Sequence, residues 1–263
     1  MIEISNLGVT FASGTPLEKH ALKTIDLSID SGRFISVIGS NGAGKSTLLG
    51  AIAGDVTCTR GKISIAERDI TRLPAAKRAR SIARVFQDPL AGSCTNLTIE
   101  ENLAIAMARG ARRDLTRALS EDWRGVFESR IKRLGLGLEK RMQDLMGQLS
   151  GGQRQAVSLI MATLAPCDIL LLDEHTAALD PGMAEFVLEL TKEVQRDLGL
   201  TTLMVTHSMS QALEAGDRTI MLHEGEIILD VDGQERQGLS VEALVSKFRD
   251  VRDGAIDSDA LLL

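Results

Sequence analysis

A nine-residue segment, GSNGAGKST, spans residues 39–47 and directly follows the short apolar run of residues 34–38. The run has the composition of a buried strand, and the sequence after the glycines, STLLGAIAG, continues as a helix. A glycine-rich loop between a strand and a helix directs backbone N–H groups and the positive end of the helix dipole toward one point. This arrangement predicts a phosphate-binding loop, and it constrains the fold more than any other segment.

The residues of this loop suit a nucleotide. Lys45 would reach the β- and γ-phosphates, Ser46 would bind Mg²⁺, and Thr47 would contact the α-phosphate. The glycines allow the backbone to curl around phosphate without Cβ clashes, and the strand and helix on either side disfavour a merely structural turn. The predicted nucleotide-binding residues of the loop are Gly39, Ser40, Asn41, Gly42, Ala43, Gly44, Lys45, Ser46 and Thr47.

Other apolar runs indicate how the rest of the chain is organised. Residues 169–172 and 201–205 are near-continuous in apolar character, which is typical of strands covered on both faces of a parallel sheet. Shorter runs that alternate or flank a turn predict antiparallel strands around this core, at residues 2–4, 27–29, 62–65, 220–222 and 227–229. We therefore expect an α/β fold with a mostly parallel core sheet and an antiparallel β subdomain.

The length of 263 residues is compatible with one large domain, and we expect a single unit over residues 1–263. Between about residues 89 and 147 the strand pattern gives way to charged sequence with a helical period, which predicts an inserted α-helical subdomain. Residues 231–263 form a short C-terminal extension, in which Ser240 is placed to begin a capped helix.

A second chemical motif is ILLLDE, residues 169–174. Its apolar residues carry Asp173 and Glu174 to the carboxyl end of a strand, the edge at which open α/β sheets bind ligands. Asp173 can hold Mg²⁺ through water, and Glu174 can orient or deprotonate an attacking water molecule. The motif alone is weak evidence, because strands commonly end in acidic residues. Together with the phosphate-binding loop it predicts nucleotide hydrolysis.

The segment LSGGQ, residues 149–153, precedes an amphipathic helix. Ser150 is a good N-cap, and the two glycines leave backbone donors uncovered, so this is a second helix start suited to an anion. The chain thus has two phosphate-binding helix starts and one set of carboxylates. We infer that both helix starts bind the same γ-phosphate, and that the LSGGQ helix start is supplied by another subunit. The residues of this predicted second site are Leu149, Ser150, Gly151, Gly152 and Gln153.

Charge and composition exclude several classes of protein. The net charge of −6 gives no general basis for binding nucleic acid or an anionic membrane, so no nucleic-acid partner is expected. The three cysteines follow neither a disulfide framework nor the spacing of a zinc site. Because we find neither a signal-peptide pattern nor an apolar run of about 18 residues, we expect a cytoplasmic chain that does not span the membrane.

The order of these motifs resembles that of the ATP-binding cassette (ABC) ATPases over essentially the whole chain. The motifs that carry the resemblance are the phosphate-binding loop, VFQDP (85–89), LSGGQ, ILLLDE, AALD (177–180) and VTHSM (205–209). LSGGQ between the two nucleotide motifs is the feature that other P-loop families lack. The resemblance implies a head-to-tail homodimer with two ATP molecules sandwiched between P-loop and LSGGQ, in a P-loop NTPase core with Mg²⁺ as cofactor.

The resemblance also assigns roles to individual residues. Gln87 would link Mg²⁺ and water to the helical subdomain, and His207 would touch the γ-phosphate, so that with Glu174 these are the expected catalytic residues. Ser46, Gln87 and Asp173 would form the Mg²⁺ site. Asp180 would belong to the loop that crosses the dimer interface. Phe11 lies where the family places an aromatic ring that stacks on adenine, although a core phenylalanine at a strand end is the alternative.

One position departs from the family pattern, because His175 follows Glu174 where the family usually has proline. An imidazole beside a catalytic carboxylate could titrate near neutral pH. We favour a substituted structural position over a second catalytic histidine.

The sequence DEHTAALDP resembles a subset of bacterial importer ATPases, similar to those that serve branched-chain amino-acid-type permeases. This resemblance implies an integral-membrane permease, an extracytoplasmic solute-binding protein, and a peripheral location at the cytoplasmic face of the membrane. The alternative is a soluble ABC-type ATPase that acts in assembly, as in iron–sulfur assembly. Tandem translation-factor or chromosome-type cassettes are disfavoured because only one P-loop is present and a long coiled coil is lacking.

Overall fold

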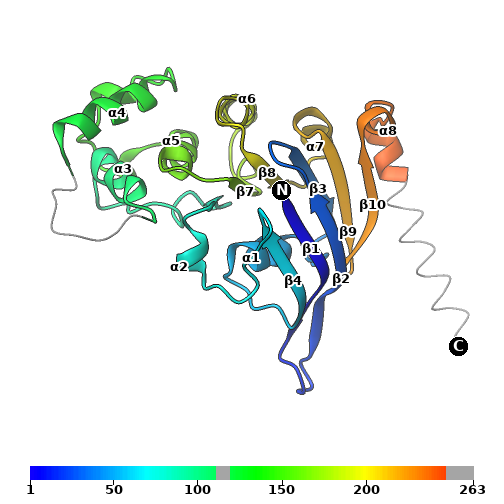
Figure 1. Ribbon diagram of the computed structural model, residues 1–263. Helices are drawn as coiled ribbons and strands as arrows, with labels where there is room; N and C mark the ends of the chain where they lie inside the picture. Colours follow the sequence, from blue (N-terminus) through cyan, green and yellow to red (C-terminus); the bar gives the residue numbers. More distant parts are fainter. Residues whose placement is uncertain (111–118, 247–263) are drawn as a thin grey trace, which may run out of the picture.

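The computed structural model describes residues 1–110 and 119–246. Its secondary structure alternates between strands and helices (Figure 1). The strands are β1 (Ile2–Phe11), β2 (Lys19–Ile29), β3 (Phe34–Gly39), β4 (Arg60–Ile65), β5 (Arg68–Asp69), β6 (Ile82–Val85), β7 (Ile169–Asp173), β8 (Thr201–Val205), β9 (Arg218–His223) and β10 (Glu226–Asp232). The helices are α1 (Lys45–Ala53), α2 (Ala75–Arg78), α3 (Ile99–Met107), α4 (Glu121–Lys132), α5 (Gly151–Leu164), α6 (Pro181–Leu198), α7 (Met209–Ala215) and α8 (Gly233–Gln237), with 3₁₀ turns η1 (Leu138–Lys140) and η2 (Met146–Gln148).

These strands form two sheets. The larger sheet has the order β10-β9-β3-β8-β7-β6, and all neighbouring pairs in it are parallel except β9 with β10. The smaller sheet has the order β2-β1-β4-β5 and is antiparallel throughout. The predicted α/β fold class, with a mostly parallel core and an antiparallel β subdomain, is confirmed.

One expectation about the strands was correct only in part, and one strand was missed. The runs at residues 220–222 and 227–229 do form an antiparallel pair, β9 with β10, but β9 also pairs in parallel with β3, so the pair belongs to the larger sheet. Strand β6, which pairs in parallel with β7, was not expected from the sequence. With four residues, one of them Arg84, this strand is too short and too polar to produce a clear apolar run.

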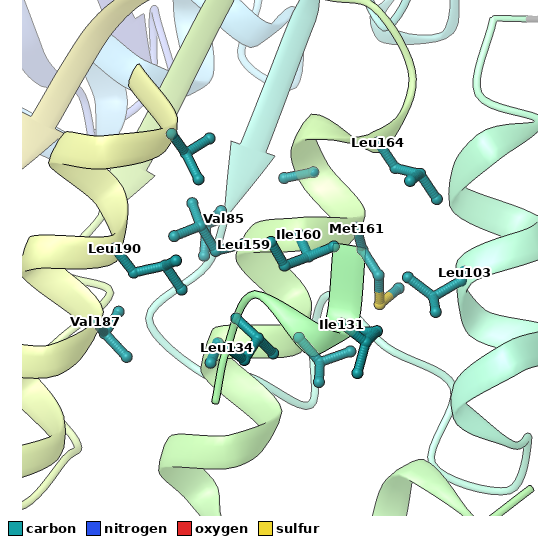
Figure 2. Packing of buried hydrophobic residues seen from close by; sticks show 14 of the residues in the cluster. Val85, Leu103, Ile131, Leu134, Leu159, Ile160, Met161, Leu164, Val187 and Leu190 are labelled. Carbon is teal, nitrogen blue, oxygen red and sulfur yellow. The ribbon is translucent and has the colours of Figure 1, made fainter. Parts of the chain in front are cut away.

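Strand β7 separates two hydrophobic cores. Leu170 and Leu172 point into the core formed with α3, α4, α5 and α6, part of which Figure 2 shows. Ile169 and Leu171 point to the other face, into the core shared by the two sheets and α1. Successive side chains of a strand point to opposite faces, so burial on both sides explains the unbroken apolar run. Packing on both faces of the sheet therefore holds the carboxyl end of β7 in position.

The segment assigned to a helical insertion contains α3, α4, η1 and η2 (Figure 1). Helix α3 begins with a capping box, in which the Thr98 side chain accepts from the Glu101 backbone and the Glu101 carboxylate accepts from Thr98. Phe127 and Ile131 of α4 are fully buried against this core. Within the described residues, we find no helix with the length and apolar character needed to cross a bilayer.

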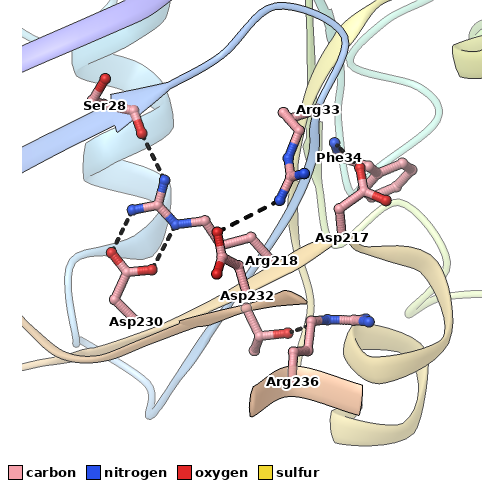
Figure 3. Close-up of polar contacts among 9 residues, drawn as sticks. Ser28, Arg33, Phe34, Asp217, Arg218, Asp230, Asp232 and Arg236 are labelled. Carbon is pink, nitrogen blue, oxygen red and sulfur yellow. Dashed lines mark hydrogen bonds and ion pairs between the residues drawn. The ribbon is translucent and has the colours of Figure 1, made fainter. Parts of the chain in front are cut away.

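Polar contacts stabilise the edge of the larger sheet that is formed by β9 and β10 (Figure 3). Arg218 pairs with Asp230 across the β9–β10 hairpin, and its Nη1 donates to the Ser28 carbonyl of β2 at 2.6 Å, which ties the two sheets together. The described part of the C-terminal extension packs on the same region. Arg236 donates to the Ala212 and Leu213 carbonyls at the end of α7, and Leu244 is fully buried beside α7. Residues 247–263 lie outside the described part of the chain.

Candidate functional site

The loop between β3 and α1 depends on glycine at its helix start. Gly44 is the N-cap of α1 and has a φ of 103°, and a Cβ there would lie 2.6 Å from the Ala21 carbonyl oxygen. Both facts exclude a side chain. The Lys45 Nζ donates to the carbonyls of Gly39 and Ser40, at 2.8 and 3.0 Å. The loop thus curls around the ammonium group of Lys45, which it holds at its centre.

Burial lowers the pKa of Lys45 from its ordinary value, and the negative charges of Glu174 and Asp173 act in the opposite direction. The two carboxylates therefore favour the charged ammonium form in a buried position.

Beside this loop lies a cavity of about 500 Å³. Its lining residues come from the β1–β2 hairpin, the loop, and the carboxyl ends of the core strands: Phe11, Lys19, Ala21, Asn41, Gly42, Ala43, Gly44, Lys45, Ser46, Thr47, Gln87, Glu174 and His207. All of these except Lys19 and Ala21 were singled out in the sequence. Gly39 and Ser40 do not line the cavity; they hold Lys45 instead.

Phe11 is the last residue of β1 and is 43% exposed at the edge of this cavity. This exposure argues against the alternative of a core phenylalanine. Lys19 lies opposite Phe11 in the β1–β2 pairing, and it lines the same cavity. The signal that could have revealed Lys19 is the hairpin register, which the sequence alone did not define.

Glu174 and His207 meet at the ends of neighbouring strands. β7 and β8 pair in parallel, with Asp173 opposite Val205, so the residues that follow each strand are close in space. Glu174 has a φ of 48°, and its backbone N–H donates to the Val205 carbonyl at 3.0 Å. The Glu174 Oε1 lies 2.6 Å from the His207 Nε2. A carboxylate and an imidazole are thus in direct contact at the cavity wall.

Asp173 lies behind the cavity and contacts the loop. The Ser46 hydroxyl donates to its Oδ1 at 3.1 Å, and an Arg84 Nη donates to its Oδ2 at 2.7 Å. A carboxylate next to a hydroxyl is an oxygen donor set that suits Mg²⁺. Among the described residues, no three His, Cys, Asp or Glu side chains gather into a metal-binding cluster. The donor set fits a Mg²⁺ that takes its other ligands from phosphate and water.

The helix start predicted as a second anion site is capped as expected for a helix N-terminus and is separate from this cavity. Ser150 caps α5 by accepting from the Gln153 backbone, and the Gln153 side chain accepts from Ser150 in return. Leu149 is buried in the core, and a Cβ at Gly152 would collide with Met183. A Cβ at Gly151, in contrast, would have open space around it. The exposed helix start does not line the cavity of its own chain.

Asp180 begins α6. Its Oδ1 accepts from the Met183 backbone at 3.1 Å, which makes it the N-cap, and the following Pro181 occupies the first turn. Asp180 is exposed and is not part of the cavity lining.

His175 points away from the cavity and into the protein. Its side chain is buried, and its Nε2 lies 3.1 Å from the Thr191 hydroxyl of α6. Since Thr191 donates its proton to the Val187 carbonyl, it accepts from the histidine, which places the proton on Nε2. Burial lowers the pKa of His175 to about 4. The imidazole is therefore a neutral packing residue that fastens α6 to the end of β7.

We expect this histidine to make the protein sensitive to acid. The unfolded chain takes up a proton near the ordinary pKa of 6.5, whereas the folded chain resists protonation down to about 4. Stability is present above pH 6.5 and is lost as the pH falls toward 4, by about 2 kcal/mol at pH 5. Urea unfolding of the wild type and of His175→Gln at pH 7 and pH 5 measures this loss. An equal loss in both proteins would contradict the prediction.

Comparison with known proteins adds to this geometry. The profile described as "ABC transporter" matches residues 22–177. The chain is 43% identical over 248 residues to a tyrosine transport ATP-binding protein of Clostridioides difficile, an alignment that covers 94% of this chain and 98% of that protein. It is 34% identical over 231 residues to a methionine import ATP-binding protein of Cupriavidus metallidurans, with 87% of this chain and 64% of that longer protein covered.

Solved structures also match. A dimeric post-hydrolysis state of an ATP-binding cassette bound to ADP and Pi has a TM-score of 0.76 and 30% identity, with 88% of this chain and 98% of that chain covered. A nucleotide-free ATP-binding cassette from an ABC transporter has a TM-score of 0.76 and 25% identity, with 90% of this chain and 93% of that chain covered.

Proposed function

Because the chain belongs to the ABC transporter ATP-binding family, and is accordingly an ATPase, we propose that it powers a solute importer through ATP hydrolysis at the cavity beside its P-loop. The observation that carries the proposal is the contact of Glu174 with His207 at 2.6 Å, in a cavity that the P-loop also lines. A base, an imidazole and a phosphate-binding loop converge there, which is the set that hydrolysis of a terminal phosphate requires.

Each group has a role in this reaction. Lys45 and the backbone N–H groups of the loop bind the β- and γ-phosphates, and Phe11 stacks on the adenine ring. Glu174 takes a proton from water while the water oxygen forms a bond to the γ-phosphorus and the bond to the β–γ bridging oxygen breaks. His207 donates a hydrogen bond to the γ-phosphate. The products are ADP and phosphate.

Ser46 and Gln87 would hold Mg²⁺ beside the phosphates, and Asp173 would hold it through water. When bound, the ion neutralises charge on the phosphate oxygens. The contact between Ser46 and Asp173 at 3.1 Å supports this assignment, since both oxygens face the same end of α1.

The second phosphate-binding segment acts across a dimer. The residues Leu149 to Gln153 of one protomer cover the nucleotide held by the P-loop of its partner, and Asp180 lies at the interface between them. The separation of this segment from the cavity of its own chain supports the arrangement, as does the dimeric ADP-bound cassette among the similar structures.

The proposed complex contains a membrane permease and an extracytoplasmic solute-binding protein, with this chain at the cytoplasmic face of the membrane. The segment 88–98 after Gln87 is the first place to look for permease contact. A second cavity, of about 250 Å³, lies there against α3 and α5, lined in part by Asp88, Pro89 and Ile105. The tyrosine transporter subunit at 43% identity makes an aromatic amino acid the first solute to test.

Affinity purification of the chain from membranes of its own cells tests this function. We expect a permease to copurify, and deletion of the gene to lower the uptake of labelled tyrosine. A chain that remains in the soluble fraction and brings down assembly proteins in place of a permease would favour the assembly function and contradict the importer. Normal tyrosine uptake with an associated permease would contradict only the solute.

A further inference from the structure

Arg84 is a charged residue in an otherwise apolar strand, β6, and none of the assigned catalytic roles uses it. Its side chain is only 17% exposed, and its guanidinium lies 4.7 Å from the centroid of the Phe86 ring. A cation in such a position needs partners. They are two carboxylates from other elements, Asp55 just after α1 and Asp173 at the end of β7.

The two contacts form a fork. One Nη lies 2.7 Å from an Asp55 oxygen, and the other Nη lies 2.7 Å from the Asp173 Oδ2. The planar guanidinium holds its two Nη atoms in a fixed geometry. The contact with Asp55 therefore also fixes the direction in which the other Nη donates to Asp173. The other oxygen of Asp173, Oδ1, accepts from the Ser46 hydroxyl at 3.1 Å. Both oxygens of this carboxylate are thus held, and its plane cannot rotate without breaking a bond.

The charge balance of the site gives a second reason for the fork. Asp173 and Glu174 are consecutive carboxylates beside the buried Lys45, and the Asp173 side chain is only 12% exposed. Glu174 is paired with His207, on the cavity side. Arg84 supplies an ion pair to Asp173, and it is not among the residues that line the cavity beside the P-loop. The arginine therefore holds the Asp173 carboxylate in a fixed orientation before any metal arrives.

We propose that Arg84 is a positioning residue for the Mg²⁺ site: it holds the Asp173 Oδ2 so that the Oδ1 stays beside Ser46. The inference rests on the proposed role of Asp173 in holding Mg²⁺. Partners of this kind, which orient a carboxylate at a metal site without touching the metal, commonly change metal affinity when they are lost. Arg84 also lies three residues before Gln87, which follows two residues after the end of β6.

The test measures metal binding apart from catalysis. In the Glu174→Gln background, Mn²⁺ replaces Mg²⁺ as a paramagnetic probe, and its binding in the presence of ATP is followed by electron paramagnetic resonance. Arg84→Met should raise the half-saturating Mn²⁺ concentration about tenfold. Metal-free binding of ATP should not change, because the P-loop contacts remain. Arg84→Lys keeps the charge but loses the fork, and it should give a smaller increase in the same direction.

Asp55→Asn is the matched control. It removes the other arm of the fork at a half-exposed carboxylate and should change the half-saturating Mn²⁺ concentration by no more than about twofold. The proposal would be overturned if the half-saturating Mn²⁺ concentration fell or stayed the same in both Arg84 variants. A fall would mean that Arg84 competes with the metal, and no change would mean that its role is purely structural. Thermal unfolding reports any loss of stability separately. Failure of the Glu174→Gln parent to bind Mn²⁺ with ATP would instead contradict the proposed Mg²⁺ site itself.

Discussion

Replacement of Glu174 by glutamine is expected to lower ATP hydrolysis at least about 100-fold while ATP binding persists, because the amide cannot accept the proton of the attacking water. Glutamine has nearly the same shape and can occupy the same backbone position, so the P-loop cavity should remain intact. The lost contact involves a half-exposed His207, and the free energy of unfolding should change little. With ATP bound and not consumed, the protein should accumulate as a dimer.

Phosphate release measures the rate, a fluorescent nucleotide measures binding, and size-exclusion chromatography with ATP and Mg²⁺ measures the dimer. Glu67→Gln is a matched control, since Glu67 is also a glutamate with positive φ, at 65°, but lies exposed in the β4–β5 turn. It should hydrolyse ATP at the wild-type rate. Wild-type turnover in Glu174→Gln would exclude this residue as the base.

Substitution of Gly151 by aspartate should abolish hydrolysis although the monomer folds normally. Gly151 is the first residue of α5, and a side chain there has open space. An acidic group in the first turn is favourable for the helix dipole, so thermal stability should be kept or slightly raised. The same negative charge would face the γ-phosphate of a nucleotide bound to the partner protomer. Gly125→Asp, at another open position on α4, provides a control outside the interface.

A mixture of two inactive proteins tests whether this segment acts across the dimer. Lys45→Ala damages the P-loop, and Gly151→Asp damages the second phosphate-binding segment. In a head-to-tail dimer of one of each, one site carries both defects and the other carries none. An equal mixture should therefore recover about a quarter of the wild-type rate if the sites act independently. If each chain supplied both segments to its own nucleotide, the mixture would stay inactive.

The sequence predicted the central part of the fold because its signals are local. Residues 34–38, 169–172 and 201–205 lie in strands buried on both faces, and this burial leaves an apolar run that can be recognised without knowledge of the neighbours. The P-loop glycine motif can likewise be recognised locally. Gly44 is required because its φ is positive and because a side chain there would collide with the backbone of β2.

Features that depend on pairing were not accessible in the same way. Strand β6 has too few apolar residues to be recognised alone, and its strand character follows from its neighbour β7. Lys19 enters the cavity only because the hairpin register places it opposite Phe11. The contact of Arg84 with Asp173 joins residues 89 positions apart. The closeness of Glu174 and His207 could be anticipated from the family resemblance, but the left-handed backbone at Glu174 could not.

The packing of the C-terminal extension has a practical consequence for work with this protein. Arg236 and Leu244 hold helix α7, which begins two residues after His207. Truncation of the chain before residue 244, or fusion of an affinity tag there, would remove contacts that hold α7 in place. The position of His207, just before this helix, would then be less well defined. A tag after residue 246 would spare these contacts, so the choice of fusion point decides whether a measured turnover number describes the native site.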